Sequence, residues 1–378
     1  MQIFDVYPLY DIEPVRAREV YLWDKNGVQY LDFYGGHAVI SIGHSHPHYV
    51  RRLTTQLDHL GFYSNSVQIP LQKELAARLG ELSGYNDYQL FFSNSGAEAN
   101  ENALKLASFH NRRKLVIAFA GAFHGRTSAT VAVTDNPKIR APLNENHEVI
   151  FLPLNDETAL QHAFQRDNIC AAIVEGIQGI AGIHLPAPRF LRKLQKLCEQ
   201  SGALLILDEV QSGYGRSGKF FAHQFADIRP DLITIAKGMG NGFPVAGLLI
   251  NPKFQASHGL LGTTFGGNHL ACAAAVAVLE VIAQEKLIDN SAKMGDYLLS
   301  ELRWITKGLK EVRGRGLMIG VELDFATETI RKKMLFEHRI FTGSSHNPNT
   351  IRLLPPLTLK QEHADRFLES FAAVMRDL

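Results

Sequence analysis

A lysine that follows a short apolar run is the first residue in the chain that could do chemistry. Lys237 comes directly after the run 233–236, which is rich in β-branched residues, and before the glycine-rich segment 238–242. A lysine at the mouth of a buried strand is desolvated, which lowers its pKa and leaves a free amine that can attack a carbonyl carbon. This position predicts Schiff-base chemistry, although lysines in general are more often solvated.

A second apolar run, residues 203–207, ends in the two carboxylates Asp208 and Glu209. In open α/β sheets, ligands bind beyond the carboxyl ends of the strands, so carboxylates at these ends are typical of sites. The stretch from Asp208 to Lys237 is long enough for a crossover between two strands, and its glycine-rich part, 211–219, is predicted to be a loop.

A third feature is the segment 93–100, which follows an apolar run and is predicted to open a helix. Ser95 and Glu98 have the spacing of a capping box. Free N–H groups and the dipole at a helix start attract anions, and the small residues Gly96 and Ala97 let a phosphate approach closely. The alternative is an ordinary capped helix start.

A Schiff-base lysine, a strand-end aspartate and a phosphate cradle are what pyridoxal phosphate requires of a protein. The sequence resembles the class III, fold type I aminotransferases, and within them most closely the acetylornithine aminotransferases. The resemblance is carried, nearly from end to end, by the segments 21–24, 30–33, 43–47, 94–100, 123–127, 208–211, 236–238, 264–268, 312–316 and 352–356.

The resemblance implies an α/β fold of type I in two domains. Residues 46–274 would form a large domain with a mostly parallel sheet flanked by helices, and 1–45 with 275–378 a small α+β domain from both chain ends. The apolar pattern agrees, because 190–200 predicts an amphipathic covering helix. It also predicts buried strands at 114–120, 171–174, 203–208, 232–236 and 245–250.

The resemblance also implies catalytic roles for Lys237 and Asp208. Lys237 would hold pyridoxal phosphate covalently and move a proton during the reaction. Asp208 would pair with the pyridine nitrogen, because a nearby negative charge raises the pKa of that nitrogen. The other implied cofactor contacts are Ser95, Gly96 and Ala97 around the phosphate, Phe123 and Val210 on the ring faces, Gln211 near the phenolic oxygen, Glu175, and Thr264 from the neighbouring subunit of a homodimer.

Two arginines are implied to bind substrate carboxylates. Arg126, with Thr263 close by, would bind the α-carboxylate of an N-acylornithine, and Arg352 that of glutamate or 2-oxoglutarate. A planar guanidinium matches a carboxylate in two parallel hydrogen bonds, although either arginine could instead form a structural ion pair. The implied activity is transfer of the δ-amino group of N-acylornithine to 2-oxoglutarate in arginine metabolism.

One segment departs from the family pattern. The family reads Glu-Pro-[Ile/Val]-Gln-Gly-Glu where this chain has residues 175–180, so Glu175 is kept and Ile180 replaces the second glutamate. In relatives such as ornithine aminotransferase that glutamate pairs with the second arginine. Without it Arg352 is free for anions, which suggests a negatively charged acyl group such as succinyl. The alternative is that the glutamate was lost without a change in substrate.

Composition agrees with a soluble enzyme rather than with a nucleic-acid or membrane protein. The 378 residues are 46% hydrophobic, and 39 Lys+Arg against 38 Asp+Glu leave a net charge of +1, too small to attract nucleic acid or an anionic membrane. Cys170, Cys198 and Cys272 lack metal-ligand spacing and are predicted to be buried thiols in a reducing compartment. The first residues do not resemble a signal peptide, and the apolar stretch 271–283 is too short to span a bilayer, so a cytoplasmic location is predicted.

Three other motifs predict no additional site. The glycines of 238–242 resemble a dinucleotide pattern, but Phe243-Pro244 follow where a helix should begin. His44, His46 and His48 are predicted to lie in a polar loop rather than to bind metal. Segment 313–316 is predicted to be a turn.

Alternative functions remain open at this point. Within the class, the enzyme could use ornithine or 4-aminobutyrate. A catalytically silent pyridoxal-phosphate binder would lack the lysine or a carboxylate-binding arginine, and all three residues are present: Lys237, Arg126 and Arg352. A nicotinamide-dependent dehydrogenase would need a glycine fingerprint that opens a βαβ unit, which is missing.

Overall fold

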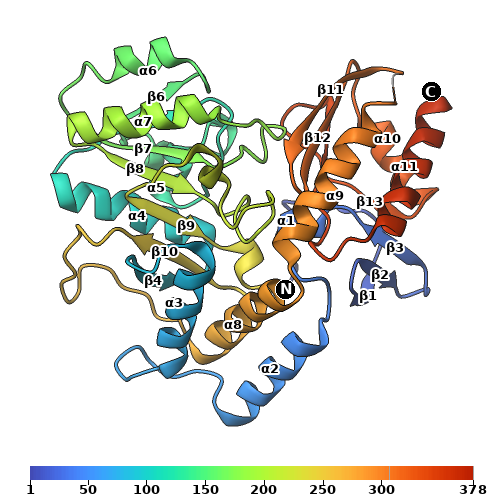
Figure 1. Ribbon diagram of the computed structural model, residues 1–378, viewed down its shortest axis with the longest axis horizontal. Coiled ribbons are helices and arrows are strands. Elements are labelled where there is room, and N and C mark those ends of the chain that lie inside the picture. The colour runs from blue at the N-terminus through green and yellow to red at the C-terminus, as the bar shows by residue number, and fades with distance from the viewer. Residues whose placement is uncertain (306, 378) are drawn as a thin grey trace.

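A seven-stranded sheet forms the centre of the larger lobe in the computed structural model, which describes residues 1–305 and 307–377 (Figure 1). Strand β10 is antiparallel to both of its neighbours, and the other neighbouring strands pair in parallel. The predicted mostly parallel sheet is therefore confirmed. The strands in spatial order are β4 (Gln89–Ser93), β10 (Ala246–Ile250), β9 (Leu232–Ile235), β8 (Leu204–Asp208), β7 (Ile169–Glu175), β5 (Leu115–Phe119) and β6 (Val149–Leu152).

All five strands predicted from apolar runs are present, and the sheet also contains β4 and β6, which the sequence did not predict. Both additional strands lie at the edges of the sheet. An edge strand is less buried than a central one, so its apolar pattern is shorter and weaker. In β6, for example, only Leu152 is fully buried.

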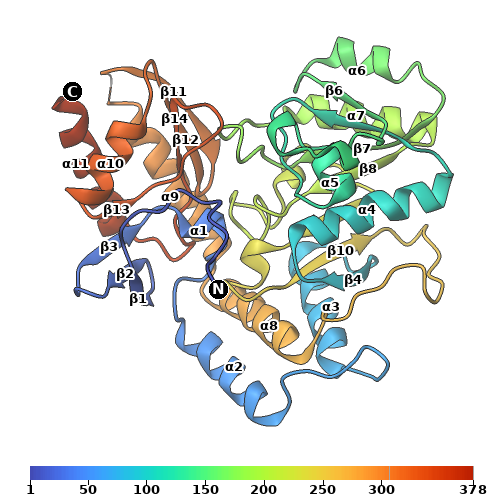
Figure 2. The same cartoon turned by 180° about the vertical axis from the view of Figure 1, so that it is seen from behind.

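Helices cover both faces of this sheet, as a doubly wound fold requires. Helix α4 (Gly96–Asn111) packs on strands β9, β10 and β7 from one side, with α5 (Ser128–Ala132) beside it. Helices α6 (Glu157–Ala163) and α7 (Pro188–Ser201) lie on the other side, as Figures 1 and 2 show from opposite directions. The predicted amphipathic helix is confirmed in α7, where Leu191, Leu194 and Cys198 are buried.

The smaller lobe is built from both ends of the chain. Strand β13 (Ile340–Phe341) pairs in parallel with β3 (Gln29–Asp32), which continues the sheet of β1 (Pro14–Arg18) and β2 (Tyr21–Asp24). A second, antiparallel sheet consists of β11 (Leu309–Arg315), β12 (Met318–Leu323) and β14 (Thr350–Leu353). Its helices are α9 (Leu287–Leu302), α10 (Glu328–Phe336) and α11 (Gln361–Arg376).

The turn predicted at 313–316 is wrong for its first residues. Residues 313–315 belong to strand β11, and only Gly316, with a φ of 53°, lies in the tight connection to β12. A run of alternating arginine and glycine contains no apolar residue and so does not predict a buried strand. Arg313 is buried by partners that lie elsewhere in the chain. Those partners are described below.

Helix α8 (His269–Gln284) joins the two lobes. It packs against α2 (Pro47–His59) and α3 (Pro70–Ser83) and leads directly into α9. Within residues 1–305 and 307–377, no helix is long and apolar enough to cross a membrane. The three cysteines are buried and unpaired, as predicted.

Short elements complete the structure. They are the one-turn segment α1 (Gly35–Ala38) and the 3-10 helices η1 (Pro137–Ile139), η2 (Pro142–Asn144), η3 (Ala222–Ala226) and η4 (Lys237–Met239).

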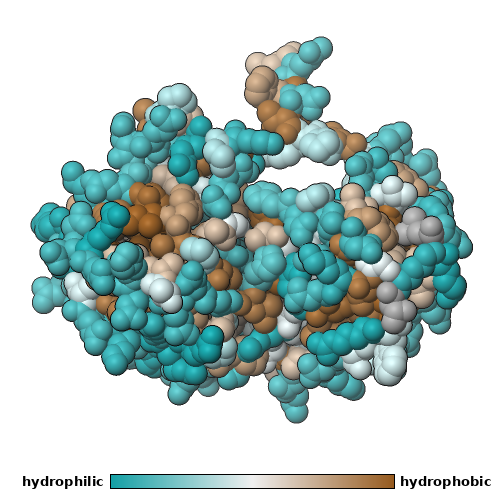
Figure 3. All heavy atoms as spheres, turned by 90° about the horizontal axis from the view of Figure 1, so that it is seen from above, coloured by the Kyte–Doolittle hydropathy of each residue, from teal (hydrophilic) through white to brown (hydrophobic). Residues whose placement is uncertain are grey.

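Seen from above, the two lobes lie side by side, apolar patches are exposed on both, and a narrow arm projects from the body (Figure 3).

Candidate active site

A cavity of about 400 Å³ opens at the carboxyl ends of three neighbouring strands. Glu175 is the last residue of β7, Asp208 is the last residue of β8, and Lys237 lies just beyond β9. Parallel pairing sets Glu175 opposite Asp208, and Asp208 opposite Thr234. The sequence-predicted residues that line the cavity together are Ser95, Gly96, Ala97, Phe123, Arg126, Glu175, Asp208, Val210, Gln211 and Lys237.

Lys237 begins the single turn η4 and is held in a left-handed conformation, with a φ of 44°. Such a φ is uncommon outside glycine and is often found at functional sites. Burial lowers the pKa of its ammonium, and the charge of Arg352 acts in the same direction, while Asp208 and Glu175 oppose them. The environment therefore favours the free amine more than water does.

Asp208 is buried and receives hydrogen bonds at both oxygens. Its Oδ1 accepts from the backbone N–H of Val210 at 3.0 Å. Its Oδ2 accepts from Asn100 Nδ2 at 2.7 Å and lies 2.7 Å from His124 Nδ1. A buried carboxylate with several donors is held in one orientation.

The partners of Asp208 are candidate site residues that the sequence did not predict. Asn100 also donates to the carbonyl of His124 at 2.8 Å and accepts from Thr234 Oγ1 at 2.7 Å. Together they connect α4, the segment after β5 and strand β9 around one carboxylate. Both residues lie inside motifs that carried the resemblance, but only their position in the fold gives them a role. A polar asparagine on the buried face of α4 was the one available signal.

Glu175 is a buried carboxylate in the lining of the cavity. Its carboxylate accepts from the N–H of Phe123 at 3.0 Å and from that of Gly179 at 2.9 Å. Burial raises the pKa of Glu175 and the nearby charge of Asp208 adds to this shift, while His124 and the two N–H donors oppose it. Glu175 thus fixes the start of the segment that follows β7 against the backbone of Phe123.

The predicted phosphate cradle is the start of α4. Ser95 is the N-cap, and its hydroxyl accepts from the N–H of Glu98 at 3.2 Å, as the capping-box spacing predicted. The N–H groups of Gly96 and Ala97 point out of the helix start, where a helix has donors without internal partners. A Cβ at Gly96 would lie 2.7 Å from Val210 Cγ1, so only glycine lets the helix start pack this closely against Val210.

Gln211 connects the cavity to segment α1. Its Nε2 donates to the carbonyl of His37 at 3.1 Å, and its Oε1 is buried without a partner among the described residues. Residues 35–38 all have positive φ. Partial burial, together with the charges of Arg352 and Lys237, lowers the pKa of His37 to about 4, so this imidazole is neutral near pH 7.

Three predicted residues lie outside the lining of this cavity. Thr263 and the exposed Thr264 follow a separate loop, where Thr263 Oγ1 accepts from Asn94 Nδ2 at 3.4 Å. Arg352 is buried on β14, in the smaller lobe. It remains electrostatically close, because its charge is one cause of the lowered pKa of Lys237.

Arg352 has spare hydrogen-bonding capacity. Its Nε donates to the carbonyl of Ser344, while its Nη1 is buried without a partner in the described part of the chain. Burial lowers the pKa of its guanidinium. Ile180, which replaces the family's glutamate, offers only its backbone carbonyl, which accepts from His346 N–H at 2.8 Å. Arg126, in contrast, is exposed at the rim of the cavity.

The three alternating histidines do not converge on one point. His44 pairs with Asp32 and His46 with Glu285, each at 2.9 Å, and His48 pairs with Glu280 at 2.6 Å. No cluster of three metal-ligating side chains occurs in residues 1–305 or 307–377.

This arrangement corresponds to a known family over almost the whole chain. The model of the family described as aminotransferase class-III matches residues 6–375. The chain belongs to the class-III aminotransferases. The fold is accordingly that of the fold type I transferases, and the protein is an aminotransferase, as the sequence resemblance predicted.

Individual relatives of this aminotransferase agree with the family. It is similar to acetylornithine aminotransferase 1 of Bordetella bronchiseptica, with 39% identity over 98% of this chain and 97% of the relative. The acetylornithine aminotransferase of Archaeoglobus fulgidus is also 39% identical, over 97% and 96% of the two chains. Among solved structures, Toxoplasma gondii ornithine aminotransferase with partial occupancy of PLP at its active site has a TM-score of 0.88 and 28% identity, covering 98% of this chain and 92% of that one.

Proposed function

We propose that the cavity at the carboxyl ends of β7, β8 and β9 holds pyridoxal phosphate. The observation that carries this proposal is the meeting of the Lys237 amine and the Asp208 carboxylate in one cavity that a helix start also lines. The helix N-terminus fits a phosphate, and the absence of a Cβ at Gly96 lets this helix start lie directly against Val210. The buried, unpartnered Oε1 of Gln211 fits a ligand oxygen that carries a proton. Phe123 and Val210 would enclose the ring.

In the proposed mechanism, pyridoxal phosphate supplies the electron sink that stabilises negative charge at the reacting carbon. The Lys237 amine would take the proton from that substrate carbon and deliver it to the C4′ atom of the cofactor. Asp208 would pair with the ring nitrogen, because Asn100, His124 and the N–H of Val210 hold its carboxylate in one orientation. Glu175 orients Phe123 through its backbone N–H.

The amino donor is proposed to be an N-acylornithine and the acceptor 2-oxoglutarate, so that the δ-amino group is transferred and glutamate is formed. Relatives named acetylornithine aminotransferase, from a bacterium and an archaeon, support N-acetylornithine and a place in arginine metabolism. Arg126 at the cavity rim would bind the donor's α-carboxylate, with Thr263 near it. Arg352 would bind a carboxylate of the acceptor. Three unpaired buried thiols favour a reducing compartment such as the cytoplasm.

The second candidate donor is N-succinylornithine, and one observation supports it. Arg352 forms no ion pair with a carboxylate among the described residues, and Ile180 stands where the family has a glutamate. A free arginine can receive an anionic acyl group in one half-reaction and the oxo acid in the other.

The test is a donor panel: N-acetylornithine, N-succinylornithine, ornithine and 4-aminobutyrate, each with 2-oxoglutarate. We expect the two acylated donors to exceed the others in kcat/KM by about a hundredfold, because an unmatched charge or a missing contact at a buried site costs on the order of two to three kcal/mol. Glutamate formation is the measurement. A preference for ornithine or 4-aminobutyrate contradicts the proposed donor, and a clear preference for the acetyl compound contradicts the succinyl candidate.

A homodimer is proposed to complete the site through Thr264. The loop that carries this threonine lies beside an exposed apolar patch: Phe62 and Phe265 have ring centroids 5.4 Å apart, and Asn65 Nδ2 donates to the carbonyl of Gly266 at 3.0 Å. Contiguous exposed apolar residues mark interfaces. Other exposed apolar residues near Phe62 in the sequence are Leu57, Leu60, Tyr63 and Val67.

Light scattering is expected to give twice the mass of one 42.1 kDa chain. A Phe265→Asp variant is expected to shift that mass toward the monomer, because it places a charge inside the patch. A wild-type monomer contradicts the shared site.

We further propose the domain division 46–274 and 1–45 with 275–378, with the boundary inside α8.

A further inference from the structure

A tongue of chain, residues 176–187, reaches from the active site to the smaller lobe. It begins directly after Glu175, whose carboxylate accepts from the tongue's own Gly179 N–H at 2.9 Å. It folds back on itself, since Gln178 and His184 exchange backbone hydrogen bonds at 2.9 and 3.1 Å. Its first residues are thus fixed at the cavity. Its tip, Gly182 and Ile183, lies on the sheet of β11, β12 and β14.

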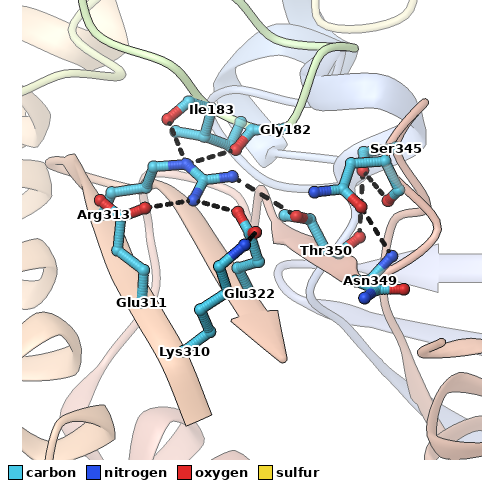
Figure 4. Close-up of polar contacts among 10 residues, drawn as sticks. Gly182, Ile183, Lys310, Glu311, Arg313, Glu322, Ser345, Asn349 and Thr350 are labelled. Atoms are coloured by element: carbon cyan, nitrogen blue, oxygen red, sulfur yellow. Dashed lines mark hydrogen bonds and ion pairs between the residues drawn. The ribbon is translucent and has the colours of Figure 1, made fainter. Parts of the chain in front are cut away.

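Arg313 on β11 holds the tip of the tongue. Its Nε donates to the carbonyls of Gly182 and Ile183 at 2.8 and 3.1 Å, and its Nη2 lies 3.4 Å from Thr350 Oγ1 on β14 (Figure 4). Its Nη1 donates to Glu311 and Glu322, both at 2.6 Å. One buried guanidinium therefore joins the tongue to the strand that carries Arg352.

The tongue needs such a hold because its tip is strained. Ile183 has a φ of 63° and Gly182 a φ of 126°. A β-branched residue in the left-handed region is unfavourable, and it persists only where surrounding contacts fix it. Those contacts are the hydrogen bonds to Arg313 and the packing of Ile183 with Met318 and Leu354.

The strand register places Arg313 and Arg352 on either side of the tongue. Arg313 pairs with Gly320 on β12, and Gly320 pairs with Arg352 on β14. Residues directly opposite each other in an antiparallel sheet share one face. A Cβ at Gly320 would lie only 2.8 Å from the carbonyl of Gly182, so the tongue rests on this glycine between the two arginines.

We propose that Arg313 is a positioning residue for the carboxylate site at Arg352. Arg313 clamps the tongue against Gly320, and the clamped tongue fixes where the Arg352 guanidinium meets a dicarboxylate substrate. Arg313 is less suited than Arg352 to bind that substrate, because the tongue carbonyls occupy its Nε and the carboxylates of Glu311 and Glu322 already pair with its Nη1. The inference rests on the proposed role of Arg352 in binding the acceptor.

The test uses the pyridoxal-phosphate-loaded protein and the unreactive dicarboxylate glutarate, with binding measured by calorimetry. Arg313→Gln is expected to raise the Kd for glutarate about tenfold, since a small misplacement of a carboxylate contact is costly. The KM for 2-oxoglutarate should rise with it, while the KM for the amino donor stays unchanged. Hydrogen exchange is expected to be faster in 176–187.

Two further variants separate positioning from general stability. Glu311→Gln removes a network charge that touches neither the tongue nor β14, and is expected to leave the Kd unchanged. Gly320→Ala keeps every charge but displaces the tongue, and is expected to raise the Kd as Arg313→Gln does. In Arg313→Gln the buried Glu322 still has Lys310, at 2.7 Å, and Glu311, which loses its partner, is exposed to solvent, so no buried carboxylate is left unpaired.

The possible failures are distinct. If Arg352→Gln abolishes glutarate binding but Arg313→Gln and Gly320→Ala leave it unchanged, the positioning role is wrong and the proposed function stands. If the wild-type protein binds no glutarate, or binds it equally well in Arg352→Gln, the role of Arg352 is wrong, and the positioning inference falls with it.

Discussion

Lys237→Ala is expected to lower the rate of amino transfer by about a thousandfold or more, since general acid–base catalysis alone contributes on the order of 10² to 10⁴. The variant loses both the amine that would hold the cofactor and the base that would move the proton. The measurement is glutamate formation from 2-oxoglutarate with N-acetylornithine. The second readout is covalent attachment of pyridoxal phosphate after borohydride reduction, which should disappear.

The matched control is Lys196→Ala, which removes an exposed lysine on α7. It is expected to keep wild-type activity and wild-type cofactor attachment. Alanine at 237 removes an amine whose burial is unfavourable. Thermal unfolding of Lys237→Ala should therefore show no loss of stability. Retained activity in this variant would show that another group does the chemistry.

Asp208→Asn is expected to lower kcat by about one to three orders of magnitude, because a neighbouring charge shifts the pKa of its partner by roughly one to three units. An amide cannot keep the cofactor's ring nitrogen protonated. It also presents an N–H group to Asn100 and His124, which both point at Oδ2 in the wild type. The absorbance of the bound cofactor as a function of pH measures the effect on the ring directly.

Asp227→Asn serves as the control, because Asp227 is an exposed aspartate in a left-handed conformation that asparagine also tolerates. Asp208→Glu keeps the charge and is expected to retain more activity than Asp208→Asn. If Asp208→Asn lowers only the unfolding temperature while its kcat and cofactor spectrum stay at wild-type values, the carboxylate is structural and the assignment is wrong.

Much of the candidate site was predictable because it consists of short local patterns. An apolar run followed by a carboxylate or a lysine predicts a strand and the residue at its carboxyl end, and both Asp208 and Lys237 lie where this rule places them. Ser95 and Glu98 predicted a capped helix start, and α4 begins there. The edge strands β4 and β6 were not predicted, since partial burial weakens their apolar pattern.

The polar networks were not predictable in this way. His124 and Asn100 reach Asp208 from positions 84 and 108 residues away in the chain. Arg313 looked like part of a turn, yet it is buried because its partners at Gly182 and Ile183 lie 131 and 130 residues before it. A guanidinium in the sequence is equally suited to solvent, to a substrate or to such a network.

The sequence by itself therefore determined the strand ends, the helix start and the family, because each depends on contiguous residues whose backbone preferences and apolar spacing act locally. The tertiary structure decided which buried charges are already paired and which are free. Arg313 and Arg352 stand opposite the same glycine, but carboxylates and carbonyls occupy the first while the second keeps a buried, unpartnered nitrogen. That difference arises from long-range packing of the tongue, and the desolvation of each group depends on it.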